Sequence, residues 1–225
     1  PCRNGAECLD SSSALAPTRP LDILGSQRNP GRSCDHIYSE GFYKESGPAW
    51  VSYGHGLQKV YCNQKDEGGG WTLLMKASDR GDAFQFSSDH WAEPTVLNPG
   101  DLTLDVADAK YDPFNNMMAT EYLAVWPEGS FAWRIGPFTA TTALQFFKTP
   151  RVLGSASGDA FNSEYFSSLP GDGQLYVIAH EDPTRASVRW GYSWTSEDAS
   201  ANVAGGGIGL DGHKPEWRLS AGDYY

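Results

Sequence analysis

Three consecutive glycines, Gly68 to Gly70, lie between an apolar run that leads into Cys62 and a second apolar run that begins at Trp71. Glycine adopts backbone conformations closed to other residues, but it loses more conformational entropy on folding than they do. A chain accepts that cost where a turn must be tight or where its backbone must approach another group closely. The continuous apolar character of 71–76 predicts a central strand. We therefore expect a closely packed turn that leads into the middle of a sheet.

The four cysteines are Cys2, Cys8, Cys34 and Cys62. None of them belongs to a paired CxxC pattern, and their spacing does not fit a zinc site. Four cysteines permit three disulfide pairings. If the bridges form, the protein belongs in an oxidising extracellular or periplasmic compartment.

The composition predicts a folded protein that does not bind nucleic acid. The 225 residues are 40% hydrophobic and include 8 Trp, enough for a substantial core in one large or two small domains. The 17 basic and 28 acidic residues give a formal net charge of −11, which would repel a phosphate backbone. Most of these charges should form a solvated surface, although they also suit a protein that collects divalent cations. No stretch approaches the roughly 18 apolar residues of a membrane span.

The chain divides into a linker and one domain. Residues 1–32 are expected to form a separate tail, in which 10–32 is rich in Ser, Pro, Gly and Ala and predicts a flexible linker, and the folded domain is expected over 33–225. The chain begins at Pro1-Cys2 and not with a signal peptide, which suggests a processed or engineered fragment. Weak helical periodicity predicts an α+β fold with much loop.

Short helical segments are expected at 35–38 and 89–93, and the chain after Ser193 is expected to be irregular. The residue patterns predict strands at 49–52, 57–61, 71–76, 121–125, 131–135, 174–179 and 187–192.

Catalytic motifs are missing from the sequence. The glycine run 205–209 lacks the Lys-Ser/Thr of a phosphate-binding loop, and no dinucleotide fingerprint, GxSxG elbow or HExxH pair is present. A pair of carboxylates for glycoside hydrolysis can always be chosen from 28 acidic residues, so that possibility carries little weight. We therefore predict that the protein is not an enzyme.

Calcium is the metal that the loops favour. Calcium takes six to eight oxygen ligands from Asp, Glu, Asn and backbone carbonyls. Suitable stretches are 78–82 followed by Asp89, then 195–202, and then 205–212. None has the spacing of an EF-hand, and the alternative is ordinary loop chemistry, because Asp, Asn and Gly are common in turns.

Four short motifs together carry a family resemblance. They are Ser33-Cys34, Tyr61-Cys62, the GGGWTL stretch 68–73 and the DAKY stretch 108–111. The chain resembles a fibrinogen-related domain over 33–225 and is closest in pattern to the intelectins, or X-type lectins. The stretch 1–8 resembles part of an EGF-like repeat.

The resemblance implies an extracellular α+β domain with a central twisted sheet, short helices and long calcium-binding loops. We expect the pairings Cys2–Cys8 and Cys34–Cys62. The second closes a loop of about 28 residues and would stabilise the fold by roughly 3 to 4 kcal/mol. The family usually continues into a last strand that closes the sheet. This chain stops at 223–225, so either it is cut short or its sequence ends differently, and the fold could lose a strand.

The resemblance also assigns site residues. The calcium ligands it implies are Asp79, Asp82, Asp89, Glu197, Asp198, Asn202 and Asp211. Intelectins bind glycans by letting a vicinal diol of the sugar complete the coordination of calcium. The residues expected to contact the sugar are His180, Glu181, Tyr192, Trp194 and Trp217, whereas Trp190 is expected in the core.

These observations predict a secreted, calcium-dependent carbohydrate-binding module whose partners are glycans or cell-surface carbohydrate. The alternative is an extracellular adhesion module that binds proteins and in which calcium is only structural.

Overall fold

The computed structural model describes residues 23–41, 44–78, 81–105, 107–125, 132–155, 174–179, 188–194, 204–209 and 217–222. Its helices are short and its strands are arranged in two antiparallel sheets, so the predicted α+β class is confirmed. The elements in chain order are α1 (Cys34–Glu40), β1 (Gly47–Ser52), β2 (Leu57–Asn63), η2 (Asp66–Gly68), β3 (Trp71–Ala77), η3 (Asp89–Trp91), β4 (Ala109–Lys110), α2 (Asp112–Asn116), β5 (Glu121–Val125), β6 (Ala132–Ile135), α3 (Ala143–Phe146), β7 (Arg151–Ser155), β8 (Gln174–Ala179), β9 (Val188–Trp194), β10 (Ala204–Ile208) and β11 (Trp217–Gly222).

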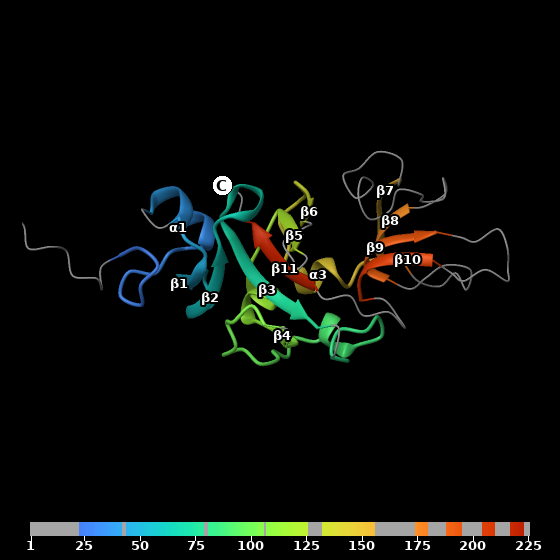
Figure 1. Ribbon diagram of the computed structural model, residues 1–225, viewed down its shortest axis with the longest axis horizontal. Helices are drawn as coiled ribbons and strands as arrows, with labels where there is room; N and C mark the ends of the chain where they lie inside the picture. Colours follow the sequence, from blue (N-terminus) through green and yellow to red (C-terminus); the bar gives the residue numbers. More distant parts are fainter. Residues whose placement is uncertain are drawn as a thin grey trace, which may run out of the picture.

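The larger sheet has the strand order β1-β2-β3-β11-β5-β6, and β4 pairs with the far end of β3. All seven residues of β3 are buried, as the continuous apolar run predicts for a central strand. The smaller sheet has the order β10-β9-β8-β7. Figure 1 shows α3 between the two sheets along the long axis of the molecule.

The triple-glycine turn packs against α1. Gly69 and Gly70 have φ angles of 82° and 84°, in the region that favours glycine. A Cβ atom on Gly70 would lie 2.8 Å from Oδ1 of Asp35 in α1. The side chain of Gln64 joins the two elements, because its Nε2 donates to the Cys34 carbonyl at 3.3 Å and its Oε1 accepts from Gly70 N at 2.8 Å. The glycines therefore permit both the turn and the close approach of helix and strand.

The Cys34–Cys62 disulfide, which the sequence predicted, closes the same junction. It links α1 to β2 and lies in a small buried cluster with Ile37, Val51 and Val60. The predicted Cys2–Cys8 pair lies outside the described residues.

Part of the predicted linker contacts the sheet. Trp50 N donates to Gly25 O at 2.8 Å, and Gly31 forms a parallel bridge with Val51. Leu24 packs on the disulfide cluster. The boundary at residue 32 stays a prediction, since residues 1–22 are outside the described part of the chain.

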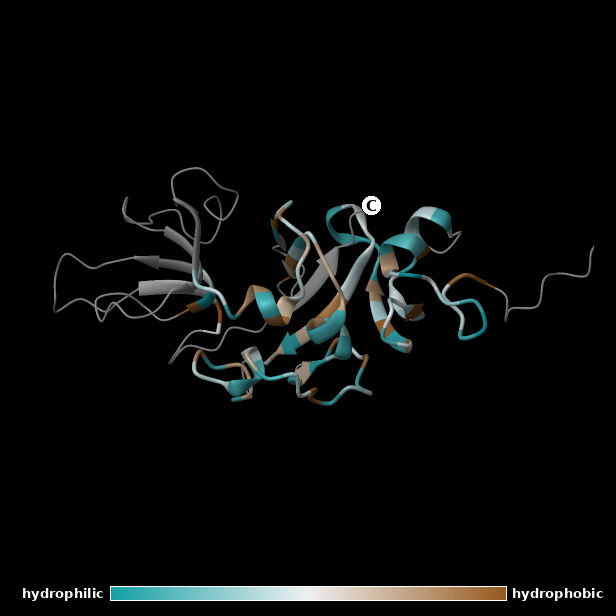
Figure 2. Ribbon diagram, turned by 180° about the vertical axis from the view of Figure 1, so that it is seen from behind, coloured by the Kyte–Doolittle hydropathy of each residue, from teal (hydrophilic) through white to brown (hydrophobic). Residues whose placement is uncertain are grey.

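The main core joins the two sheets through aromatic side chains. Trp91 and Phe147 have ring centroids 5.2 Å apart, and Phe147 lies 6.5 Å from Trp190 of β9. Trp190 is fully buried, as expected for a core residue. Figure 2 shows hydrophobic colours in the middle of β3 and mainly hydrophilic colours on α1. No helix among the described residues has the length and apolar character needed to span a membrane.

One expectation about the end of the chain is wrong. The region after Ser193 is not wholly irregular, because β11 lies between β3 and β5 and pairs with both. The glycine run of the same region forms β10, in which Gly206 pairs with Tyr192 and Gly207 with Gly191.

Candidate functional site

The loop after β3 is the first stretch for which the sequence predicted metal ligands. Asp82 and Asp89 are both exposed on this segment, and Asp89 is the first residue of η3. The third predicted ligand of the loop, Asp79, lies outside the described residues.

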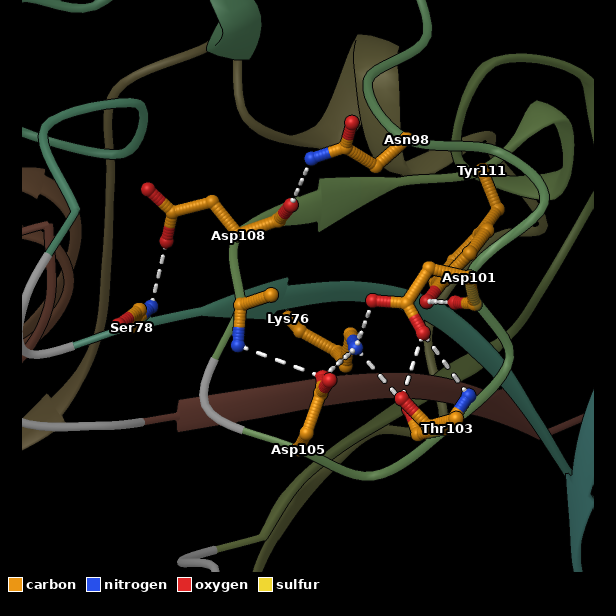
Figure 3. A network of polar contacts seen from close by, with 9 residues as sticks. Lys76, Ser78, Asn98, Asp101, Thr103, Asp105, Asp108 and Tyr111 are labelled. Carbon is orange, nitrogen blue, oxygen red and sulfur yellow. Dashed lines mark hydrogen bonds and ion pairs between the residues drawn. The ribbon is translucent and has the colours of Figure 1, made fainter.

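Asp108 anchors this loop, a role that the sequence did not reveal. Its Oδ1 accepts a hydrogen bond from Ser78 N at 2.6 Å, and its Oδ2 accepts one from Ala83 N at 3.2 Å. A Cβ atom on Gly81 would lie 1.7 Å from Oδ2 of Asp108, so no larger residue fits there without movement. Asn98 Nδ2 holds Asp108 from the other side by donating to its carbonyl at 2.8 Å (Figure 3). One carboxylate therefore fixes both ends of the loop.

Lys76 organises the neighbouring acidic loop. Its side chain is 2% exposed, and Nζ lies 2.7 Å from Oδ2 of Asp101 and 2.7 Å from Oδ1 of Asp105. Nζ also donates to the Thr103 carbonyl at 3.0 Å. Figure 3 shows the ammonium group enclosed by these acceptors. The buried cation thus has three oxygen partners from one loop, as a buried charge requires.

These contacts change the acidity of the two aspartates. Partial burial opposes ionisation of Asp101, but the hydrogen bonds from Lys76 and Thr103 prevail and lower its pKa to about 2. The hydrogen bond from Lys76 likewise lowers the pKa of Asp105. Both groups are therefore carboxylates at neutral pH and compensate the Lys76 charge.

Lys110 holds the segment that carries Asp89. Lys110 is fully buried, and Nζ donates to the carbonyls of His90 at 2.7 Å and Glu93 at 2.5 Å. The same ammonium group lies 4.6 Å from the centre of the Phe114 ring. Burial and the nearby Lys148 charge lower the pKa of Lys110 to about 8, while Glu93 acts in the opposite direction.

The described residues do not by themselves make a metal site. Among them, no group of three or more His, Cys, Asp or Glu side chains is placed to hold a metal ion. The Asp108 oxygens accept backbone hydrogen bonds, and Asp101 and Asp105 contact Lys76. Asp82 and Asp89 have the right chemistry but need further ligands. The remaining predicted ligands, which are Asp79, Glu197, Asp198, Asn202 and Asp211, lie outside the described residues, so calcium stays a prediction.

The residues predicted to contact sugar are divided between the two sheets. Tyr192 and Trp194 belong to β9, where Trp194 pairs with Ala204. Trp217 begins β11 and pairs with Ala77. His180 and Glu181 lie outside the described residues. Contact of these five residues with one sugar therefore remains a prediction.

The fold and its disulfide define an α+β domain of the type predicted for extracellular modules. No family model matches the chain. Two curated proteins align with parts of it. Angiopoietin-related protein 6 of Mus musculus is 33% identical over 67 residues, which are 30% of this chain and 14% of that protein. Echinolectin 1 of Echinometra lucunter is 29% identical over 93 residues, which are 40% of this chain and 40% of that protein.

The chain thus spans less than half the length of either curated relative. A solved structure, the fibrinogen-like globe domain of human ANGPTL6, aligns with a TM-score of 0.34 and 19% identity over 53% of this chain and 50% of that chain. The predicted resemblance to fibrinogen-like domain proteins is confirmed by these relatives. The EGF-like resemblance of residues 1–8 lies outside the described part.

Proposed function

We propose that this chain is an extracellular, calcium-dependent carbohydrate-binding module. The observation that carries the proposal is its similarity to a protein named as a lectin, Echinolectin 1, over 93 residues. The acidic loop after β3, which Asp108 fixes in place, adds support because it presents Asp82 and Asp89 on the surface. The Cys34–Cys62 disulfide fits an oxidising environment outside the cell.

The proposed calcium ligands fall into two groups. Asp79, Asp82 and Asp89 supply the loop after β3, and Glu197, Asp198, Asn202 and Asp211 supply the loops near β9 and β10. Bound calcium would offer coordination positions that two neighbouring sugar hydroxyls can take from water. Glu181 and His180 would bond the same hydroxyls, and Tyr192, Trp194 and Trp217 would line the site.

The protein's own residues prepare the first loop before any ion binds. Asp108 fixes the loop at Ser78 and Ala83, and Lys110 fixes the Asp89 segment through the carbonyls of His90 and Glu93. Such preorganisation lowers the entropic cost of assembling a site. The proposed role is binding and not catalysis.

The second candidate is an adhesion module that binds protein ligands and in which calcium is only structural. It is favoured by the similarity to Angiopoietin-related protein 6 and by loops that the chain orders with its own charges, such as Lys76. In this case, glycan binding would be undetectable both in calcium and after its removal.

A glycan array probed in calcium buffer and again in EDTA tests the proposal. We expect binding to a subset of glycans that is strongly weakened in EDTA and weakened in the Asp82→Asn and Asp89→Asn variants. Glu40→Gln, an exposed acidic position at the end of α1, is the matched control and should bind like the wild type. Binding that is equally strong in calcium and in EDTA, or no binding to any glycan, would contradict the proposal.

A further inference from the structure

A pocket lies against β2, β3 and β5 of the larger sheet, and none of its described lining residues is assigned to calcium. Its volume is about 280 Å³. This is just below the roughly 300 to 1,000 Å³ typical of small-molecule sites, so the pocket suits one small ring and not an extended ligand. Four apolar or aromatic side chains line it: Tyr61, Leu73, Leu104 and Val125.

Polar side chains from the turn after β2 line the rest of the pocket. They are Ser46, Asn63, Lys65 and Asp66. Asn63 Nδ2 donates to Oδ2 of Asp66 at 2.6 Å, which places an amide and a carboxylate side by side. An amide group has two N–H donors and a carboxylate has two acceptor oxygens, so the pair offers one further donor and one further acceptor. A sugar hydroxyl, which both accepts and donates, matches this arrangement.

Internal hydrogen bonds hold the polar turn in place. Asn63 Oδ1 accepts from the backbone N–H groups of Lys65 at 3.1 Å and Asp66 at 3.2 Å. Ser46 Oγ accepts from Gln64 N at 2.9 Å, and Trp71 Nε1 donates to the Asp66 carbonyl at 3.0 Å. The polar wall is therefore fixed to β3, so its side chains should lose little conformational entropy when a ligand binds.

The opposite wall is fixed by the Lys76 ion pairs. Leu104 lies between Thr103, whose carbonyl accepts from Lys76 at 3.0 Å, and Asp105, which lies 2.7 Å from the same ammonium group. The buried cation thus holds an apolar residue, 36% exposed, at the edge of the pocket. An exposed apolar side chain in a fixed position suits the C–H face of a sugar ring.

The charges of the pocket favour a neutral ligand. Lys65 and Asp66 carry opposite charges, and Lys65 also pairs with Glu45 at 3.0 Å. A phosphate or carboxylate would be repelled by Asp66, and an apolar ligand would leave the buried part of the polar turn without partners. We propose that this pocket binds one neutral sugar ring without calcium, as a second subsite of the same module. The inference rests on the proposed glycan-binding function.

Protein NMR in EDTA tests this subsite with neutral methyl glycosides as the probe. We expect saturable shifts of the Asn63 side-chain amide and the Trp71 indole N–H, because both groups are bonded to Asp66. Asp66→Asn should weaken binding about tenfold by removing the charged acceptor. Leu104→Ala should weaken it several-fold, while Val96→Ala, at a residue of similar exposure outside the pocket, should not.

The outcomes separate this inference from the proposed function. Shifts confined to Asn63 and Trp71 that weaken in both pocket variants support the subsite. No shift of these groups with any glycoside, or shifts equal in wild type and both variants, would overturn it. Calcium-dependent glycan binding with these groups unmoved would overturn the subsite alone and leave the proposed function standing.

Discussion

Three charged side chains, Lys76, Asp108 and Lys110, set the conformation of the loops around β3. Each acts on groups distant in sequence: Asp108 bonds Ser78 and Ala83, Lys76 bonds the 101–105 loop, and Lys110 bonds the carbonyls of His90 and Glu93. Lys76 and Lys110 are both buried in β-strands. The protonation of Lys110 and of Asp101, which pairs with Lys76, should therefore be linked to stability.

The Asp101 carboxylate should contribute to stability in acid. Its folded pKa of about 2 lies below its unfolded value, so its contribution is complete above about pH 4 and is lost as the pH falls toward 2. After allowance for solvent screening, the effect is about 1 kcal/mol. Urea unfolding at a series of pH values should show a shallower fall in the free energy of unfolding for Asp101→Asn than for wild type. Glu40→Gln should keep the wild-type slope, and identical slopes in all three proteins would exclude this linkage.

Lys110 should also make stability rise with pH, but in the alkaline range. Its folded pKa is lowered to about 8, so between pH 8 and 10 the unfolded chain binds more protons and stability rises with pH. The neutral amine retains two N–H groups for the carbonyls of His90 and Glu93, which is why the contacts survive deprotonation. In the Lys110→Met variant this part of the rise should disappear. The comparison of the two unfolding profiles is decisive, and equal rises in both proteins would refute the assignment.

At the scale of elements, the junction of α1, β2 and β3 depends on the glycine turn. Gly68 and Gly70 both have positive φ, but only Gly70 faces a neighbour within contact distance of a Cβ atom. Gly68→Ala should cost about 1 to 2 kcal/mol for the backbone conformation alone. Gly70→Ala should cost about 3 kcal/mol or more, because its Cβ would also displace Asp35. Chemical denaturation measures both values, and equal costs would show that the close approach is unimportant.

Sequence patterns predicted local elements well and non-local ones poorly. The central strand β3 was predicted from its apolar run, and β5 and β8 match their predicted bounds. By contrast, β11 combines apolar residues with Ser220 and Gly222, and its place in the sheet is set by pairing with β3 and β5. The short helix α3, with a Thr142 cap that accepts from Gln145 N at 3.2 Å, is too brief to show a period.

The candidate site was predicted only in part for a similar reason. Asp82 and Asp89 stood out because acidic residues follow a strand in a short loop. Asp108 could not be assigned a role, since its partner Ser78 lies 30 residues earlier. A hydrogen bond between a side chain and a distant backbone N–H produces no recognisable pattern of residues in the sequence. The polar pocket at Asn63 and Asp66 was missed because its walls come together only in the folded sheet.

For the whole molecule, β11 should be essential to folding. It lies between β3 and β5, so its removal would leave two central strands with unpaired backbone groups. A chain that ends at Glu216 should lose cooperative thermal unfolding and aggregate, whereas a chain that ends at Gly222 should unfold like the wild type. Circular dichroism with heating distinguishes them. A cooperative transition of the shorter chain at the wild-type temperature would show that the strand is dispensable.

The central claim is that a calcium ion bound by this chain coordinates a vicinal diol of the sugar. Isothermal titration calorimetry tests it with a methyl glycoside that has an exocyclic vicinal diol and the same glycoside with its terminal hydroxyl replaced by hydrogen. We predict a saturable heat for the diol that depends on calcium and is missing for the deoxy compound, so that in EDTA both glycosides give the same weaker heat. Equal heats for both glycosides in calcium, or a heat for the diol that is unchanged in EDTA, would contradict the account.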